Sequence, residues 1–276
     1  MMTAVAVESR AQRARWLVSD SLALAERNLQ HVRQIPEKLI DVTLQPVMFV
    51  LLFAFVFGGV IGIPDGDYTD YLIGGILVQS LAFGMMGPGM SIATDLGEGM
   101  VDRIRSLPTS RNAYLIGHFL AELAAAVVAI TVLAVTGLAV GWSIGSSVPE
   151  ALAAVALLVL FASAMIATGT LLGLLARSAD AVQGLVFMAV FPLTFLSNAF
   201  VPAAGLPDGL QLVGEWNPVS AVVAGVRTLF GNPTALPDGA AWPLQHPVLA
   251  ALAWSLAILA VCGPLCVRRF RARTTG

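Results

Sequence analysis

Long apolar runs recur along this chain from residue 40 to residue 267, and no block between them has the composition of a soluble domain. A helix needs about 20 apolar residues to cross the roughly 30 Å hydrocarbon core of a bilayer. Soluble domains are about 25% charged, whereas this chain is 57% hydrophobic and 12% charged. We therefore expect an all-α integral membrane protein with one membrane domain, 39–267. Its six predicted spans lie at about 40–61, 70–93, 114–140, 150–175, 181–201 and 247–267.

The distribution of basic residues predicts the orientation, because Lys and Arg concentrate in cytoplasmic loops. A cytoplasmic N-terminus places fourteen of the fifteen Lys and Arg residues on the inner side and leaves only Arg227 outside. We expect both termini to be cytoplasmic. Aromatic residues near the predicted outer boundaries are expected at the interface, as amphipathic rings prefer: Tyr68, Tyr71, Trp142, Trp216 and Trp242.

Segments outside the spans have their own patterns. Residues 1–15 are expected to be a flexible tail, and the basic residues 268–276 a cytoplasmic C-terminal tail. Residues 16–38 mix apolar and charged residues as an amphipathic helix on the inner membrane surface does, although a loosely ordered tail is the alternative. The first 38 residues lack the pattern of a cleavable signal peptide. The outer segment 202–246 is long for a loop and is expected to include a short helix that dips into the outer leaflet.

Residue types that carry catalysis or metal binding are sparse. The only lysine, Lys38, has no glycine before it, so the phosphate-binding loop G-x-x-x-x-G-K-[ST] does not occur. No H-x-x-x-H pair and no Asp-rich diphosphate motif is present. Cys262 and Cys266 share one face of the last span and are expected to be small apolar side chains. With a net charge of −2, no basic field suggests nucleic acid. We expect no enzyme activity, metal or bound cofactor.

One carboxylate lies inside a predicted span. Glu122 is about two turns into the third span, and an intramembrane acid is costly enough to be a functional candidate. It supports an alternative interpretation as a proton-coupled carrier, although it also lies close enough to the inner interface to pair there with an arginine. Small-xxx-small pairs that permit close helix approach occur at Gly58/Gly62, Gly137/Gly141 and Gly169/Gly173.

The stretch DLGEGMVDRIRSLPTSR, residues 95–111, has six charges in seventeen residues between two apolar spans. On a helix its charged residues fall on one face and Met100, Ile104 and Leu107 on the other. Pro108 ends such a helix, and Ser110 is placed to cap the next one. The pattern predicts a short inner helix that lies on the membrane or docks into a groove of another protein. Its charged face comprises Asp95, Glu98, Asp102 and Arg105.

Four segments of the chain match a known family. They are LAERNLQHVRQIPEKLIDVTLQPVMFVLLFAFVFGG at 24–59, GEGMVDRIRSLPTSR at 97–111, FPLTFLSNAFVP at 191–202 and EWNPVSAVVAGVRTLFGN at 215–232. With these segments the chain resembles the ABC-2-type permeases, the membrane subunits of exporters that pair with a separate ATPase. It is most similar to the actinobacterial daunorubicin/doxorubicin resistance type. The second and fourth segments are the most specific.

The resemblance implies partners and a place in a bacterial plasma membrane. The inner helix between spans two and three would be the coupling helix that seats in a cleft of the ATPase, and two ATPase copies would bind ATP and Mg. A second permease copy would pair mainly through spans one and five, as a homodimer or alternatively a heterodimer. Residues expected to contact the ATPase or shape the helix are Asp95, Glu98, Asp102, Arg103, Arg105, Pro108 and Arg111.

The resemblance also implies short re-entrant outer helices, with Asn217, Pro218 and Arg227 at motif positions. A hydrophobic or amphiphilic drug-like substrate is expected, with lipid or polysaccharide as alternatives. Methionine and phenylalanine make adaptable, weakly selective surfaces, so the candidates for the substrate path are Phe83, Met85, Met86, Phe187, Phe191 and Phe195. Contact with lipid or neighbouring helices is the alternative for each of these residues.

Overall fold

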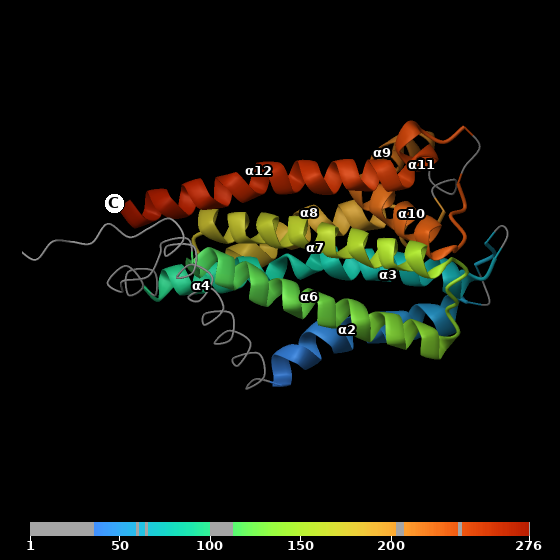
Figure 1. Cartoon of the computed structure of the whole chain (residues 1–276), viewed down its shortest axis with the longest axis horizontal. Helices are drawn as coiled ribbons and strands as arrows, with labels where there is room; N and C mark the ends of the chain where they lie inside the picture. The colour runs from blue at the N-terminus through green and yellow to red at the C-terminus, as the bar shows by residue number, and fades with distance from the viewer. Residues whose placement is uncertain are drawn as a thin grey trace, which may run out of the picture.

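The computed structural model describes residues 36–58, 61–63, 66–99, 113–202, 207–236 and 239–275, and in these ranges the chain is built of helices (Figure 1). A single β-bridge joins Ile63 and Gly66. The N-terminal segments 1–15 and 16–35 of the expected tail and interfacial helix lie outside the described residues. The helices are α2 (Pro36–Phe57), α3 (Tyr68–Gly84), α4 (Met86–Gly97), α6 (Ala113–Val140), α7 (Val148–Leu175), α8 (Ala179–Phe195), α9 (Asp208–Glu215), α10 (Pro218–Phe230), α11 (Trp242–Gln245) and α12 (Pro247–Thr275).

Four stretches of helix in the described residues are long and apolar enough to cross a membrane, Tyr68–Gly97, Tyr114–Val140, Val148–Leu175 and Pro247–Ala272. They correspond to the second, third, fourth and sixth predicted spans. The fifth, α8, has 17 residues, fewer than the about 20 of a full crossing. In α2 the apolar part is Val47–Val56. The residues of the expected C-terminal tail, from 268 to Thr275, continue α12 as helix.

Helix boundaries follow recognisable local signals. The backbone N–H of Ser147 donates to the Glu150 carboxylate at 2.9 Å, which satisfies a donor at the start of α7. The Ser178 hydroxyl oxygen accepts from the backbone N–H of Ala181 at 3.2 Å and caps α8. The observed helices α7 and α8 each begin two residues before the predicted spans, at Val148 and Ala179 instead of 150 and 181.

The second predicted span is two helices rather than one. α3 ends at Gly84 and α4 begins at Met86. Pro88 has no N–H to donate to the carbonyl of Gly84, four residues earlier, so the regular ladder is interrupted there. The second predicted span, found as one apolar stretch at Tyr68–Gly97, therefore contains a break at Met85 that the sequence analysis did not predict.

Glycines bring α7 into backbone contact with the segment around this break. A Cβ atom on Gly169 would overlap the carbonyl oxygen of Met85, and one on Gly173 would overlap that of Gly89. Such close approach is how small residues pack membrane helices. Of the three predicted small-xxx-small pairs, Gly169/Gly173 makes this backbone contact, whereas a Cβ atom added to Gly62 or Gly141 would meet nothing within 4 Å.

Arg227 on α10 is fully buried and ties three segments together. Its guanidinium donates from Nε to the carbonyl of Tyr71 at 2.8 Å, and from its terminal nitrogens to the carbonyls of Asn198 and Ala199, each at 2.9 Å. The guanidinium carbon also lies 3.4 Å from the centre of the Tyr71 ring. The Tyr71 hydroxyl donates to the carbonyl of Asn198 at 2.7 Å. We call this cluster the arginine hub.

The aromatic residues expected near the outer boundaries differ in how far protein covers them. Tyr68, Tyr71 and Trp142 are buried inside the bundle, while Trp216 and Trp242 are about half exposed. Tyr71 is buried because it is part of the hub, and Trp142 because its ring N–H donates to Asn232. A buried aromatic with a polar end needs such a partner.

We predict that Arg227→Met destabilises the fold by on the order of 3 kcal/mol, because it removes the guanidinium donor from three buried carbonyl oxygens, of which only that of Asn198 keeps a second side-chain donor, the Tyr71 hydroxyl. We expect Arg227→Lys to restore little of this stability, because an ammonium group cannot donate to three separate carbonyls in the planar arrangement of a guanidinium. The measurement is the melting temperature of the protein in detergent. Thr228→Ala, at an exposed neighbouring position, is the control and should change it little; equal melting of Arg227→Met and the control would contradict the prediction.

Gly169→Ala should destabilise the bundle by about 1–3 kcal/mol, because the added methyl group pushes α7 away from the carbonyl of Met85. Gly184→Ala in α8 is the matched control, since nothing lies within 4 Å of its Cβ position. Alanine there should be neutral or slightly stabilising, as glycine is a poorer helix former. Thermal melting of both variants in the same detergent checks the pair, and a Gly169→Ala protein as stable as Gly184→Ala would refute close packing.

Candidate functional site

The charged stretch connects α4 to α6, and we call residues 98–112 the connector. The structure describes residues 98 and 99 of the connector and the helices on both sides of it, but not residues 100–112. The candidate coupling residues Asp102, Arg103, Arg105, Pro108 and Arg111 therefore lie outside the described residues. Glu98 is exposed. A continuous helix through 95–107 is wrong, because α4 ends at Gly97 and Gly99 has a left-handed φ of 69°. Asp95 therefore belongs to the last turn of α4 and not to a separate helix.

A hydrogen bond joins the two ends of the connector. Asp95, in the last turn of α4, accepts from the hydroxyl of Tyr114, in the first turn of α6. The Tyr114 ring stacks on Phe270 of α12 with centroids 5.5 Å apart, and on His118 with centroids 6.3 Å apart. Tyr114, His118 and Phe270 are all buried. The connector therefore leaves and re-enters the bundle at one point, where α4, α6 and α12 meet. We call this contact the Asp95–Tyr114 clamp.

Glu122 lies further along α6, on the side that faces α4. It is half buried, and its Oε2 is 3.6 Å from the Cβ position of Gly87, just before Pro88. The structure thus places this acid beside the helix break in the second span. It is two turns from the clamp along α6, and the described residues hold no group of three or more His, Cys, Asp or Glu side chains suited to a metal ion.

The candidate substrate-path residues divide into two groups. Phe187, Phe191 and Phe195 are about half exposed along α8. Phe191 and Phe195 stack with centroids 4.4 Å apart, and Phe83 packs against Phe187 at 5.6 Å. An apolar aromatic face therefore runs along α8 with Phe83 beside it. Met86 is half buried and packs on the core.

Met85 does not share that face. It is buried in the core at the break between α3 and α4, and its carbonyl lies against Gly169. The prediction that Met85 lines a path was based on residue type, which does not specify the side of a helix.

The outer motif NPVSAVVAGVRTLFGN folds as one capped helix. The side chain of Asn217 accepts from the N–H of Val219 at 2.9 Å and donates to the carbonyl of Leu193 at 2.6 Å, so it caps α10 and ties it to the end of α8. Pro218 occupies the first turn, where its missing N–H costs nothing. Gly231 ends the helix with a left-handed φ of 71°. Each motif residue thus has a physical role in placing Arg227.

Several residues of these clusters were not singled out by the sequence. Asn232 accepts from the Trp142 ring N–H at 2.9 Å and donates to the carbonyl of Ser143 at 2.8 Å, which fastens the α6–α7 loop to α10. Asn198 provides a hub carbonyl. Both asparagines lie in the quoted family segments and at the end of a helical run. This position, where asparagine side chains often bond to backbone, could have identified them. Tyr114 is the first residue of the third predicted span, 114–140, and nothing in the sequence indicated its bond to Asp95.

The sequence of this chain is similar to those of known membrane transport proteins. The ABC-2 type transporter family matches residues 20–230. The chain is 28% identical over 254 residues to the daunorubicin resistance ABC transporter permease protein DrrB1 of Streptomyces coeruleorubidus, covering 92% of this chain and 87% of the relative. It is 25% identical to the probable doxorubicin resistance ABC transporter permease protein DrrC of Mycobacterium tuberculosis, covering 95% and 92%.

A putative transport permease, ycf38, of Porphyra purpurea is 24% identical over 221 residues, covering 78% of this chain and 75% of the relative. The family match covers the segments 24–59, 97–111 and 191–202 and all but the last two residues of 215–232, the four segments on which the sequence prediction of the family was based. That prediction is confirmed. The chain belongs to the ABC-2 type transporter family.

Proposed function

We propose that this chain is the membrane-spanning permease subunit of an ATP-driven exporter of hydrophobic or amphiphilic small molecules such as anthracycline-like drugs. Membership of the ABC-2 type transporter family carries this proposal, and the drug resistance for which the DrrB1 and DrrC relatives are named supplies the substrate class. Lipid and polysaccharide remain the alternative substrates. The ATP and Mg would be bound by a separate ATPase, because the sequence of this chain has no phosphate-binding loop.

The proposed topology has six spans in a bacterial plasma membrane, with both termini cytoplasmic. It uses α2 and α8 as the first and fifth spans and α9 to α11 as the re-entrant outer segment. The basic residues support this orientation. The burial of α10 among other helices supports a segment that enters the outer leaflet, because irregular backbone at membrane depth is tolerated where protein covers it.

A second permease copy is proposed to pack on α2 and α8. Both helices present large exposed apolar residues in the single chain, including Met48 and Phe55 on α2 and Met188 and Phe191 on α8. The two helices are linked through the buried Phe200, whose ring stacks on Phe53 of α2 with centroids 4.8 Å apart and lies tilted against Phe195 of α8 with centroids 5.6 Å apart. A shared substrate path between two such faces would be lined by phenylalanine and methionine side chains.

Coupling is proposed to run through the connector into the clamp. ATP would close two ATPase subunits on each other, and the cleft of each would carry one connector with it. Because the Asp95–Tyr114 clamp holds both ends of the connector on α4, α6 and α12, motion of the connector would reach all three helices together.

Charge reversal in the connector tests the docking surface. We expect Glu98→Lys or Arg105→Glu to reduce co-purification with the proposed ATPase partner, and to reduce substrate-stimulated ATP hydrolysis, because a like-charge contact replaces a complementary one. Asp180→Lys, the same change at the exposed start of α8, is the control and should leave assembly intact. Full assembly and full transport-coupled hydrolysis in both connector variants would sink the docking proposal.

Removing the clamp hydroxyl tests transmission separately from docking. Tyr114→Phe keeps the ring that stacks on Phe270 and loses only the hydrogen bond to Asp95, so we expect a folded protein that still binds the ATPase but exports less substrate per ATP hydrolysed. Asp95→Asn retains an acceptor oxygen and should preserve coupling better. The measurement is the ratio of export to ATP hydrolysis in proteoliposomes; an unchanged ratio in Tyr114→Phe would remove the clamp from the mechanism.

A further inference from the structure

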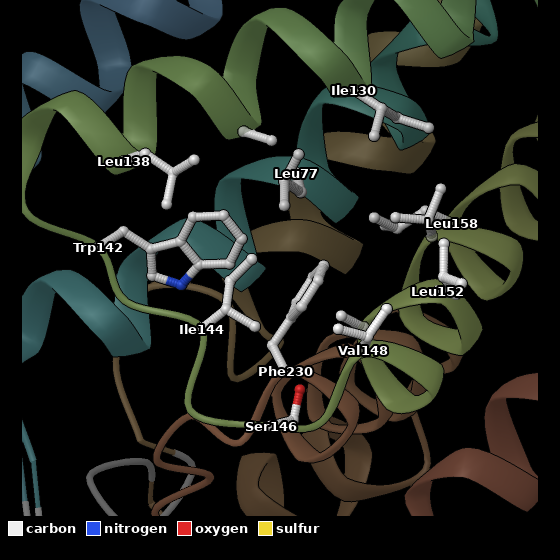
Figure 2. A pocket seen from close by; sticks show the side chains of 13 residues that line it. Leu77, Ile130, Leu138, Trp142, Ile144, Ser146, Val148, Leu152, Leu158 and Phe230 are labelled. Atoms are coloured by element: carbon white, nitrogen blue, oxygen red, sulfur yellow. The ribbon is translucent and has the colours of Figure 1, made fainter.

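A partly open apolar cavity of about 310 Å³ lies between α6 and α7, next to the 141–147 loop (Figure 2). Its floor is formed by Leu77 of α3, Leu158 of α7 and Phe230 of α10, and its two walls by side chains of α6 and α7. Figure 2 shows the labelled side chains pointing toward the cavity from α6, from α7 and from the floor. We call this cavity the α6–α7 groove. Its volume is at the lower end of the about 300–1,000 Å³ typical of ligand pockets.

The described residues that line the groove include two polar side chains, those of Trp142 and Ser146. The Trp142 ring N–H donates to Asn232, so the groove meets the hydrocarbon part of the indole. The hydroxyl oxygen of Ser146 is buried and has no hydrogen-bond partner among the described residues. In Figure 2 this oxygen lies at the loop end of the cavity. The groove therefore offers a long apolar wall and one unused hydrogen-bonding group at one end.

This composition decides what fills the groove. A buried water needs about 2–4 polar partners, and a single serine hydroxyl does not supply them. An empty space would cost its lining the dispersion contacts that a filled one provides. The rim residues Leu138, Val148 and Leu152 are exposed and apolar. In a bilayer such side chains face lipid tails, so the groove opens to hydrocarbon chains.

Polar groups beside the groove indicate the direction in which a lipid would lie. Asp70 accepts from the backbone N–H of Ser143 at 2.7 Å and from its hydroxyl at 3.0 Å, on the exposed loop next to the groove. Glu150 is held nearby by Ser147. The polar surface thus begins at the Ser146 end, where the ester region and headgroup of a lipid would be, while the apolar walls extend toward the middle of the bundle.

We propose that the α6–α7 groove binds one acyl chain of a membrane lipid, with the Ser146 hydroxyl hydrogen-bonded to an ester carbonyl of that lipid. The chain acts as a structural part of the α3–α6–α7–α10 corner. This site is on a different side of the chain from the exposed phenylalanines of α8, and the proposal does not depend on export or on the ATPase.

The test is photolabelling of the full chain in vesicles of phosphatidylethanolamine and phosphatidylglycerol that contain a phospholipid with a diazirine in one acyl chain. We expect label on peptides covering 130–158. Ala134→Phe on α6 and Ala151→Phe on α7 fill the groove from opposite walls and should abolish that label, while label on the exposed face of α12 stays constant. Ser146→Ala should reduce the label several-fold.

Matched controls place the same phenylalanine on the exposed parts of these helices outside the groove lining. Ala139→Phe on α6 and Ala153→Phe on α7 should label as the unchanged protein does. Equal groove labelling in the fillers and these controls overturns the site, and two independent fillers guard against one that fails to fold. Displacement of the label by added daunorubicin would overturn the lipid assignment in favour of transported cargo, and full labelling in Ser146→Ala would overturn the hydrogen bond.

Discussion

The fold depends on a buried cation that binds backbone. Arg227 satisfies three carbonyl oxygens with one planar group, and so joins α10, α3 and the turn after α8. Apolar burial gives little drive for helix association in lipid, where packing and hydrogen bonds between helices matter more. The arginine hub supplies the hydrogen bonds through the guanidinium. It also supplies close packing, because Gly74 lies against the aliphatic part of Arg227 and a side chain on Gly75 would overlap the carbonyl of Ala199. Burying a guanidinium is costly, and this cost is offset only where every acceptor is in place.

The hub and the Asp95–Tyr114 clamp lie at opposite ends of the α3–α4 span, with the break at Met85 between them. On one side of the break, α3 is fixed by the hub. On the other side, α4 is fixed to α6 by the clamp and to α7 by the glycine contacts. The break is held in register by Gly169, yet its carbonyl ladder is incomplete because of Pro88.

Sequence reasoning predicted the class, the four long apolar segments and most helix starts, because hydrophobic length and short polar caps are local signals. It failed where a partner distant in the chain decides the outcome. Tyr71 was assigned to the interface, since nothing near it in sequence shows that Arg227 approaches from 156 residues away. Met85 was assigned to a path, since residue type does not show that it packs against a glycine of α7. Asp95 shared a face with Glu98 in the predicted helix, but Gly99 ends that helix with a positive φ.

Two kinds of exposed apolar surface remain on the single chain, and their side chains differ. The α8 face is a row of aromatic rings linked to α2 through Phe200, and aromatic side chains are enriched where protein surfaces meet. The α6–α7 side is concave, with aliphatic walls and a single free hydroxyl among its described lining residues, and a flexible hydrocarbon chain fits such a groove better than a helix does. The Asn232 bonds fix the loop over this groove to the end of α10. An acyl chain bound in the groove would therefore contact α10, the helix that contains Arg227, through Phe230. Lipid occupancy and the stability of the arginine hub are therefore expected to be coupled.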